Sequence, residues 1–147
     1  MELVKKYALL ENLQDNKKWL DLLNIYIDKA DFVEFNTLFD PQKLNPEIQA
    51  IESDLVEKGT RQGKIFSSGI FQRFKLIEKV KNFILSRQYQ DWQNYQFEDL
   101  SLLNGKIEIL ATITHENYIF ALMDEQQRKY LLENGFDFGD LQELEIK

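Results

Sequence analysis

The chain of 147 residues contains no cysteine, one histidine and two prolines. Without cysteine it forms neither a disulfide bond nor a thiolate metal site, and one histidine leaves a zinc site dependent on carboxylates, which is unusual. We therefore expect no metal and no cofactor. The six glycines and two prolines form no linker, so residues 1–147 are interpreted as a single domain.

Long apolar runs are also missing. No stretch approaches the ~20 residues that a membrane-spanning helix requires, and the N-terminal segment lacks the pattern of a signal peptide. We therefore expect a cytoplasmic protein that does not engage a membrane. The strings G-x-G-x-x-G, G-x-x-x-x-G-K-S/T and G-x-S-x-G do not occur. No motif in the sequence identifies an enzyme active site.

Hydrophobic residues make up 44% of the chain and charged residues 29%, which is typical of a folded globular domain. The net charge of −7 disfavours general nucleic-acid binding and favours a basic partner. The charge is unevenly distributed, because residues 57–87 hold eight basic and two acidic residues whereas both flanking segments are acidic. A weaker alternative is therefore nucleic-acid binding through the basic residues 58–87, whose phenylalanines could stack on bases.

Hydrophobic periodicity predicts alternating helices and strands. Expected helices cover 2–13, 16–30 from a cap at Asn16, 45–59 from Asn45-Pro46 to Gly59, 78–87, and 124–134 from a cap at Asp124 to Gly135. Expected strands lie within 31–39, 64–67, 70–77, 107–113, 118–123 and the tail 136–147. Because neighbouring strands are joined by short turns, the predicted fold is α+β, with a mostly antiparallel sheet and helices packed on one face.

The sharpest local signal is Asn104-Gly105 between two apolar runs. This dipeptide is typical of a tight hairpin turn, whose two central residues need positive φ. Beyond it, Ile107 to Ile113 alternate between apolar and other positions. The segment Tyr118 to Met123 is apolar on both faces, which indicates a strand inside the sheet.

The leading hypothesis is a non-enzymatic, acidic protein-interaction module. An inhibitor or immunity-type protein that occludes a basic toxin or nuclease is its most concrete form. Exposed aromatic residues and carboxylates would supply the contacts. The predicted surface comprises Tyr89, Trp92, Tyr95, Glu98, Asp99, Asp137, Asp140 and Glu143. The competing interpretation of the aromatic residues is that they pack beneath a loop as part of the core.

A second hypothesis is a small enzyme or ligand-binding domain. Its candidate polar site would join His115 and Glu116, which lie in a predicted turn, with Glu98. A histidine beside carboxylates is suited to general acid–base work when the groups share a cleft. A turn histidine that hydrogen-bonds the local backbone is the simpler interpretation.

Overall fold

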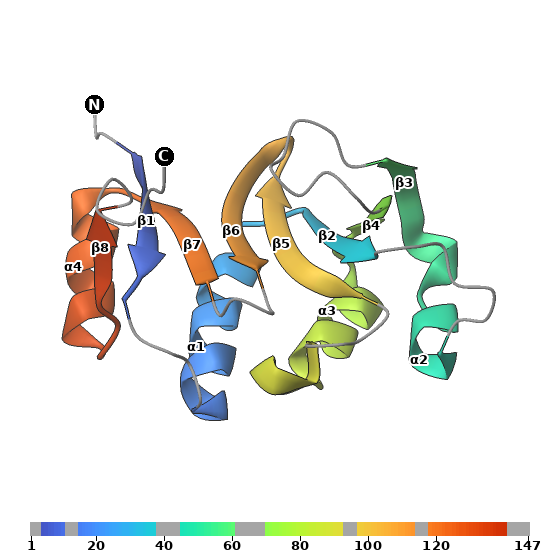
Figure 1. Cartoon of the computed structure of the whole chain (residues 1–147), viewed down its shortest axis with the longest axis horizontal. Helices are drawn as coiled ribbons and strands as arrows, with labels where there is room; N and C mark the ends of the chain where they lie inside the picture. Colours follow the sequence, from blue (N-terminus) through green and yellow to red (C-terminus); the bar gives the residue numbers. More distant parts are fainter. Residues whose placement is uncertain are drawn as a thin grey trace.

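A computed structural model describes residues 4–10, 15–37, 45–60, 70–92, 97–113 and 118–140, apart from the side chains of Thr60 and Asp140. These residues form one antiparallel sheet of eight strands with four α-helices, an α+β fold (Figure 1). In chain order the elements are β1 Lys5–Leu9, α1 Asn16–Ile27, β2 Phe32–Thr37, α2 Pro46–Gln49, β3 Leu55–Thr60, β4 Ile70–Lys75, α3 Glu78–Leu85, β5 Glu98–Asn104, β6 Ile107–Ile113, β7 Tyr118–Met123, α4 Glu125–Glu133 and β8 Phe138–Asp140. Two short 3-10 helices, η1 Glu52–Asp54 and η2 Tyr89–Trp92, complete the set.

The strands follow the order β3-β4-β2-β5-β6-β7-β1-β8 across the sheet. All seven neighbouring pairs are antiparallel. Because opposite residues of an antiparallel pair share a face, the registers divide the side chains into two sets. One of these sets includes a continuous row of buried side chains that crosses the sheet from β4 to β1. The row comprises Phe74, Val33, Leu102, Leu110, Ala121 and Tyr7.

The helices cover this inward face. Buried side chains of all four helices, among them Trp19, Ile48, Val80 and Leu131, belong to the same core cluster as the inward row. Within the described residues, no helix packs on the opposite face. The prediction of helices on one face of an antiparallel sheet is confirmed, and we call the uncovered side the open face.

The centre of the core is aromatic. Phe35 of β2 stacks on Phe97 and Trp92, with ring centroids 4.6 and 5.4 Å apart, and meets Phe74 and Phe83 edge-on. Such ring pairs add about 0.5–1.5 kcal/mol each beyond area burial. This one residue therefore connects the sheet to both α3 and η2.

Two predicted helices are wrong in whole or in part. The segment predicted as helix 2–13 contains the strand β1, because Tyr7 and Leu9 also alternate and the strand gains pairing with both β7 and β8. The helix that starts at Pro46 ends at Gln49, not near Gly59. Gly59 instead lies in β3 beneath Phe71, where an added Cβ would sit 2.9 Å from the ring.

Most other predicted elements are confirmed with shifted ends. Asp15, not Asn16, caps α1 by accepting a hydrogen bond from the Lys17 amide at 2.9 Å. The Asp124 cap is confirmed, since its carboxylate accepts from the Gln127 amide at 2.7 Å. Gly135, with a φ of 91°, follows α4 as expected.

The β5–β6 hairpin is confirmed, but its turn lies one residue later than expected. Asn104 pairs with Ile107, so the central residues are Gly105 and Lys106. Gly105 alone among these carries a positive φ, 62°. The predicted internal position of β7 is confirmed, and the short strand β8 lies within the expected tail segment at the edge of the sheet. The expected strand 64–67 and the tail residues Leu141, Leu144 and Ile146 lie outside the described residues.

Replacing Phe35 with alanine should remove the centre of the aromatic cluster. We expect a loss of about 3–5 kcal/mol in the free energy of unfolding, the usual cost of deleting a fully buried ring. Urea titration followed by circular dichroism measures it. Tyr130→Ala on the outer side of α4, where the side chain is 52% exposed, should change stability by less than about 0.5 kcal/mol. Equal losses in the two variants would contradict the assignment of Phe35 to the core.

Candidate functional site

The aromatic part of the predicted interaction surface lies in the core. Tyr89 and Trp92 are only 4% and 1% exposed, because the η2 turn directs both rings toward α1 and α3. Tyr89 meets Trp19 edge-on at 5.1 Å, and Trp92 packs against Phe35 and Phe83. These two side chains are structural, as the competing interpretation of the sequence proposed.

The acidic part of that surface is not one patch. Glu98 and Asp99 lie on β5, half-buried and buried respectively, whereas exposed Asp137 precedes β8. Four strand spacings separate β5 from β8, which is about 19 Å. Tyr95, Glu143 and the side chain of Asp140 lie outside the described residues, as do His115 and Glu116 of the alternative polar site.

Asp99 has an unusual backbone. Its φ is 53°, and it lies at a bulge between the pairs Glu34–Ser101 and Asn36–Glu98, where β5 places two residues opposite one residue of β2. Aspartate adopts the left-handed backbone conformation at such a bulge more readily than most residues do. Burial, and secondarily the charge of Asp99, raises the pKa of Tyr89 to about 12.

The open face is divided into a charged half and an apolar half. The strand registers place a second row of side chains on this face: Arg73, Glu34, Ser101, Ala111, Phe120 and Ala8, from β4 through to β1. The row begins with charged residues on β4 and β2 and ends with apolar ones on β6, β7 and β1. No sequence motif indicated this division into a charged and an apolar half. The alternation of side chains within each strand nevertheless determines which residues lie on this face.

Arg73 organises the charged half. Its Nε and Nη2 donate to Oε1 of Glu34 at 3.2 and 2.9 Å, and its Nη1 donates to Glu57 at 3.2 Å. One guanidinium thus connects three neighbouring strands, β2, β4 and β3. The Arg73 and Glu34 side chains are 20% and 13% exposed, so the pair is partly shielded from water.

The apolar half lies over β6, β7 and β1. Tyr118 and Phe120 are neighbours on β7, with ring centroids 6.0 Å apart. Tyr118 is 41% exposed and Leu10 47% exposed. Leu10 lies over Gly139 of β8, where an added Cβ would meet its side chain at 2.8 Å. Exposed apolar groups gathered on one uncovered face are typical of binding surfaces.

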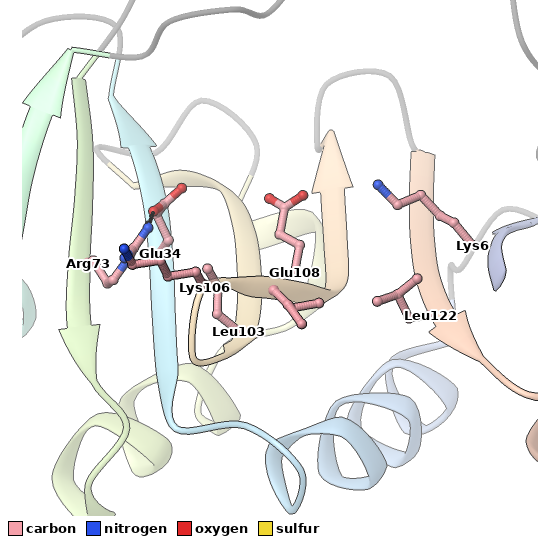
Figure 2. Close-up of a pocket in the computed structure, with 8 residues that line it drawn as sticks. Lys6, Glu34, Arg73, Leu103, Lys106, Glu108 and Leu122 are labelled. Carbon is pink, nitrogen blue, oxygen red and sulfur yellow. Dashed lines mark hydrogen bonds and ion pairs between the residues drawn. The ribbon is translucent and has the colours of Figure 1, made fainter. Parts of the chain in front are cut away.

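A depression of about 480 Å³ lies between the two halves (Figure 2). It is open to solvent and lined by Lys6, Glu34, Arg73, Leu103, Lys106, Ile107, Glu108 and Leu122. Figure 2 shows Arg73, Glu34 and Lys106 at one end of the depression, Lys6 at the other end and Glu108 between them. The lining thus combines five charged side chains with three aliphatic ones.

The described residues contain no group of three or more histidine, aspartate or glutamate side chains placed to hold a metal ion. Described members of the basic segment 58–87 are largely paired within the chain: Arg73 with Glu34, and Lys79 with Asp54 at 3.1 Å. Phe74 and Phe83 of that segment are buried, so they are not stacking platforms for bases. None of the helices described combines the length and apolar character needed to cross a bilayer.

No protein-family model matches the chain, and no curated protein or solved structure shows significant similarity to it.

Replacing only one member of the Arg73–Glu34 pair should destabilise the protein. Arg73→Met leaves the half-buried Glu34 carboxylate without its donor, so we expect a loss of about 2 kcal/mol in unfolding free energy. The double variant Glu34→Met/Arg73→Met, in which only the exposed Glu57 carboxylate loses its partner, should lose clearly less. Lys17→Met, which breaks the exposed pair with Asp21, is the control and should stay within about 0.5 kcal/mol of the parent. Additive losses in the double variant would contradict a coupled pair.

Tyr89→Phe should be neutral or slightly stabilising near pH 7, because the buried Tyr89 hydroxyl has no hydrogen-bond partner among the described residues. Unfolded tyrosine ionises near pH 10 and folded Tyr89 only near 12. Its contribution to stability is therefore complete below pH 10 and is lost as the pH rises through 12. Between about pH 9 and about pH 11, the parent should lose about 1 kcal/mol more than the variant in urea titrations. Parallel losses would contradict the shift.

Proposed function

We propose that this chain is a non-enzymatic protein-interaction module that binds a basic protein partner through its open face. The observation that carries the proposal is the uncovered apolar half of that face, where Tyr118, Phe120 and Leu10 lie without a helix above them in the described structure. An antiparallel sheet normally has one packed face and one solvated, polar face. Apolar side chains on the solvated side are better explained by a partner than by the fold.

The overall charge indicates which kind of partner. Attraction between a chain of net charge −7 and a basic protein accelerates their encounter, whereas two copies of this chain repel each other. Around the open face itself, Lys6, Lys106 and Arg73 are balanced by Glu34, Glu57 and Glu108. Attraction at long range would therefore come from the whole chain, while the docked contact itself would depend on apolar packing.

The proposed biological form is an inhibitor or immunity-type protein that covers a functional surface of a basic toxin or nuclease. Three features support it: the small size of the chain, its acidic charge, and the apolar half of the open face. The contact differs from the surface expected from sequence, since the open-face residues replace the buried pair Tyr89 and Trp92. Binding would act by steric occlusion, which needs no chemistry from this chain.

A matched pair of tyrosine variants tests the proposal. Tyr118→Glu places a charge in the apolar half, whereas Tyr130→Glu makes the same change at a similarly exposed site on α4. The parent and Tyr130→Glu should enrich the same basic protein from a lysate of the source cells. Tyr118→Glu should enrich it at least tenfold less, as expected for the loss of an interface hot spot. Quantitative mass spectrometry of affinity-captured material measures the ratio.

The charge component is separable in the same assay. Association of the captured protein with the parent should slow markedly between about 0.05 and about 0.5 M salt, because ionic screening suppresses long-range attraction. A captured protein that Tyr118→Glu retains as well as the parent would refute the open face as the site. A rate independent of salt would refute the basic partner.

A further inference from the structure

We propose that Asn104 is a site of spontaneous modification, at which its side-chain amide is lost through attack by the Gly105 backbone nitrogen, and that the Asp31 carboxylate restrains this reaction. The inference concerns the turn of the β5–β6 hairpin and does not depend on the proposed function. The dipeptide Asn-Gly occurs twice in the chain, at Asn104-Gly105 and at Asn134-Gly135. The surroundings of the two dipeptides differ, and the difference selects the first.

The reaction requires only the peptide itself and water. The Gly105 nitrogen gives up its proton and forms a bond to Cγ of Asn104. The bond between Cγ and Nδ2 breaks, and Nδ2 leaves with that proton as ammonia, so the product is a cyclic imide. Water then opens the imide at either of its carbonyls, which gives aspartate or isoaspartate. Glycine favours the attack, because it has no side chain to hinder the approach and its backbone is the most adaptable.

The hairpin turn leaves the reacting groups accessible. Asn104, Gly105 and Lys106 are all exposed. No atom beyond the chain neighbours lies within 4 Å of the position that a Cβ on Gly105 would take. Within the described structure the Asn104 side chain makes no hydrogen bond, so its carboxamide is free to turn toward the nitrogen. Space for ring closure and access for water are both present.

The second dipeptide is also exposed, but hydrogen bonds hold its reacting groups. The leaving nitrogen, Nδ2 of Asn134, donates to the Tyr130 carbonyl at 2.8 Å. The attacking nitrogen of Gly135 donates to the Leu132 carbonyl at 3.1 Å. The Lys18 ammonium donates to the Gly135 carbonyl at 2.7 Å and lies 3.7 Å from its Cβ position. Several contacts must therefore break before Asn134 can react.

Asp31 restrains the attacking nitrogen of the first dipeptide. The Gly105 amide donates to Oδ1 of Asp31 at 2.8 Å. The Asp31 backbone is itself fixed, because its amide donates to the Leu103 carbonyl and its carbonyl accepts from the Leu76 amide, both at 2.9 Å. The nitrogen must leave a charge-assisted hydrogen bond before it attacks, and the carboxylate repels the negative charge that develops as the proton is lost. Both effects slow the reaction.

Conversion of Asn104 would change the hairpin in two ways. Aspartate adds a negative charge one residue from the amide that Asp31 binds. Isoaspartate adds a carbon to the backbone at the pair Asn104–Ile107, which closes the β5–β6 ladder. Because Lys106 and Ile107 line the depression, either product alters the border of the open face.

The experiment follows both dipeptides in one sample of folded chain incubated at mildly alkaline pH. Trypsin places them in separate peptides, residues 88–106 and 130–147, whose mass rises when an amide becomes a carboxyl group. We expect Asn104 to convert at least about tenfold faster than Asn134, as the additional hydrogen bonds at Asn134 imply. Fragmentation of the first peptide should reveal isoaspartate. In urea, where folded structure is absent, the two asparagines should react at similar rates.

Two variants test the role of Asp31. Asp31→Ala removes the acceptor and should speed conversion of Asn104 about tenfold, the usual effect of losing one hydrogen bond to a charged group. The rate at Asn134 should not change, which distinguishes local release of the turn from general unfolding. Asp28→Ala, the matched control, removes an exposed carboxylate at the end of α1 and should leave both rates as in the parent.

The site and its restraint can be refuted separately. Equal rates at Asn104 and Asn134 in the folded chain, a difference that persists in urea, or a product without isoaspartate would overturn the site. An Asn104 rate that Asp31→Ala leaves unchanged or lowers, or an equal acceleration at Asn134 or in Asp28→Ala, would overturn the role of Asp31. The comparison of the two asparagines uses the parent chain alone, so it decides the site even if Asp31→Ala does not fold.

Discussion

The stacking of Phe35 on Phe97 and Trp92 determines how the rest of the chain is arranged. These rings come from β2, from the residue before β5 and from η2, and Phe83 of α3 joins them edge-on. Large aromatic side chains contribute most of the apolar area that a domain of this size can bury. Because the rings gather on one side of the strands, the helices must cover that side. In the described structure, no helix therefore covers the opposite side of the sheet.

That asymmetry links the fold to the proposed function. In the charged half of the open face, Arg73 of β4 forms ion pairs with Glu34 of β2 and Glu57 of β3 and so connects three strands. Among the described residues, no helix covers its apolar half. Exposed apolar side chains gathered on one face of a domain are typical of binding surfaces. The binding proposal follows from this exposure.

Sequence periodicity predicted the fold class, most helices and most of the strands because alternation and capping are local properties. It failed for β1, where Leu3, Tyr7 and Leu10 suit a helix and only pairing with distant β7 and β8 selects the strand. It also assigned Tyr89 and Trp92 to a surface, since a polar, aromatic run does not reveal which way a 3-10 turn directs its rings. The open face was not predictable, because strand order decides which residues become neighbours.

The position of β1 between β7 and β8 also bears on how the molecule is made. Lys5 pairs with Met123, and Leu9 with Phe138, so this strand finds its partners more than a hundred residues along the chain. On a ribosome, β1 emerges before β7 and β8, so more than a hundred further residues must be synthesised before it can pair with both of them. Pairing across such a separation is slow, because closing a long loop costs chain entropy before the strand contacts can form. During that interval Tyr7 and Leu9, which are buried in the folded chain, are exposed to water.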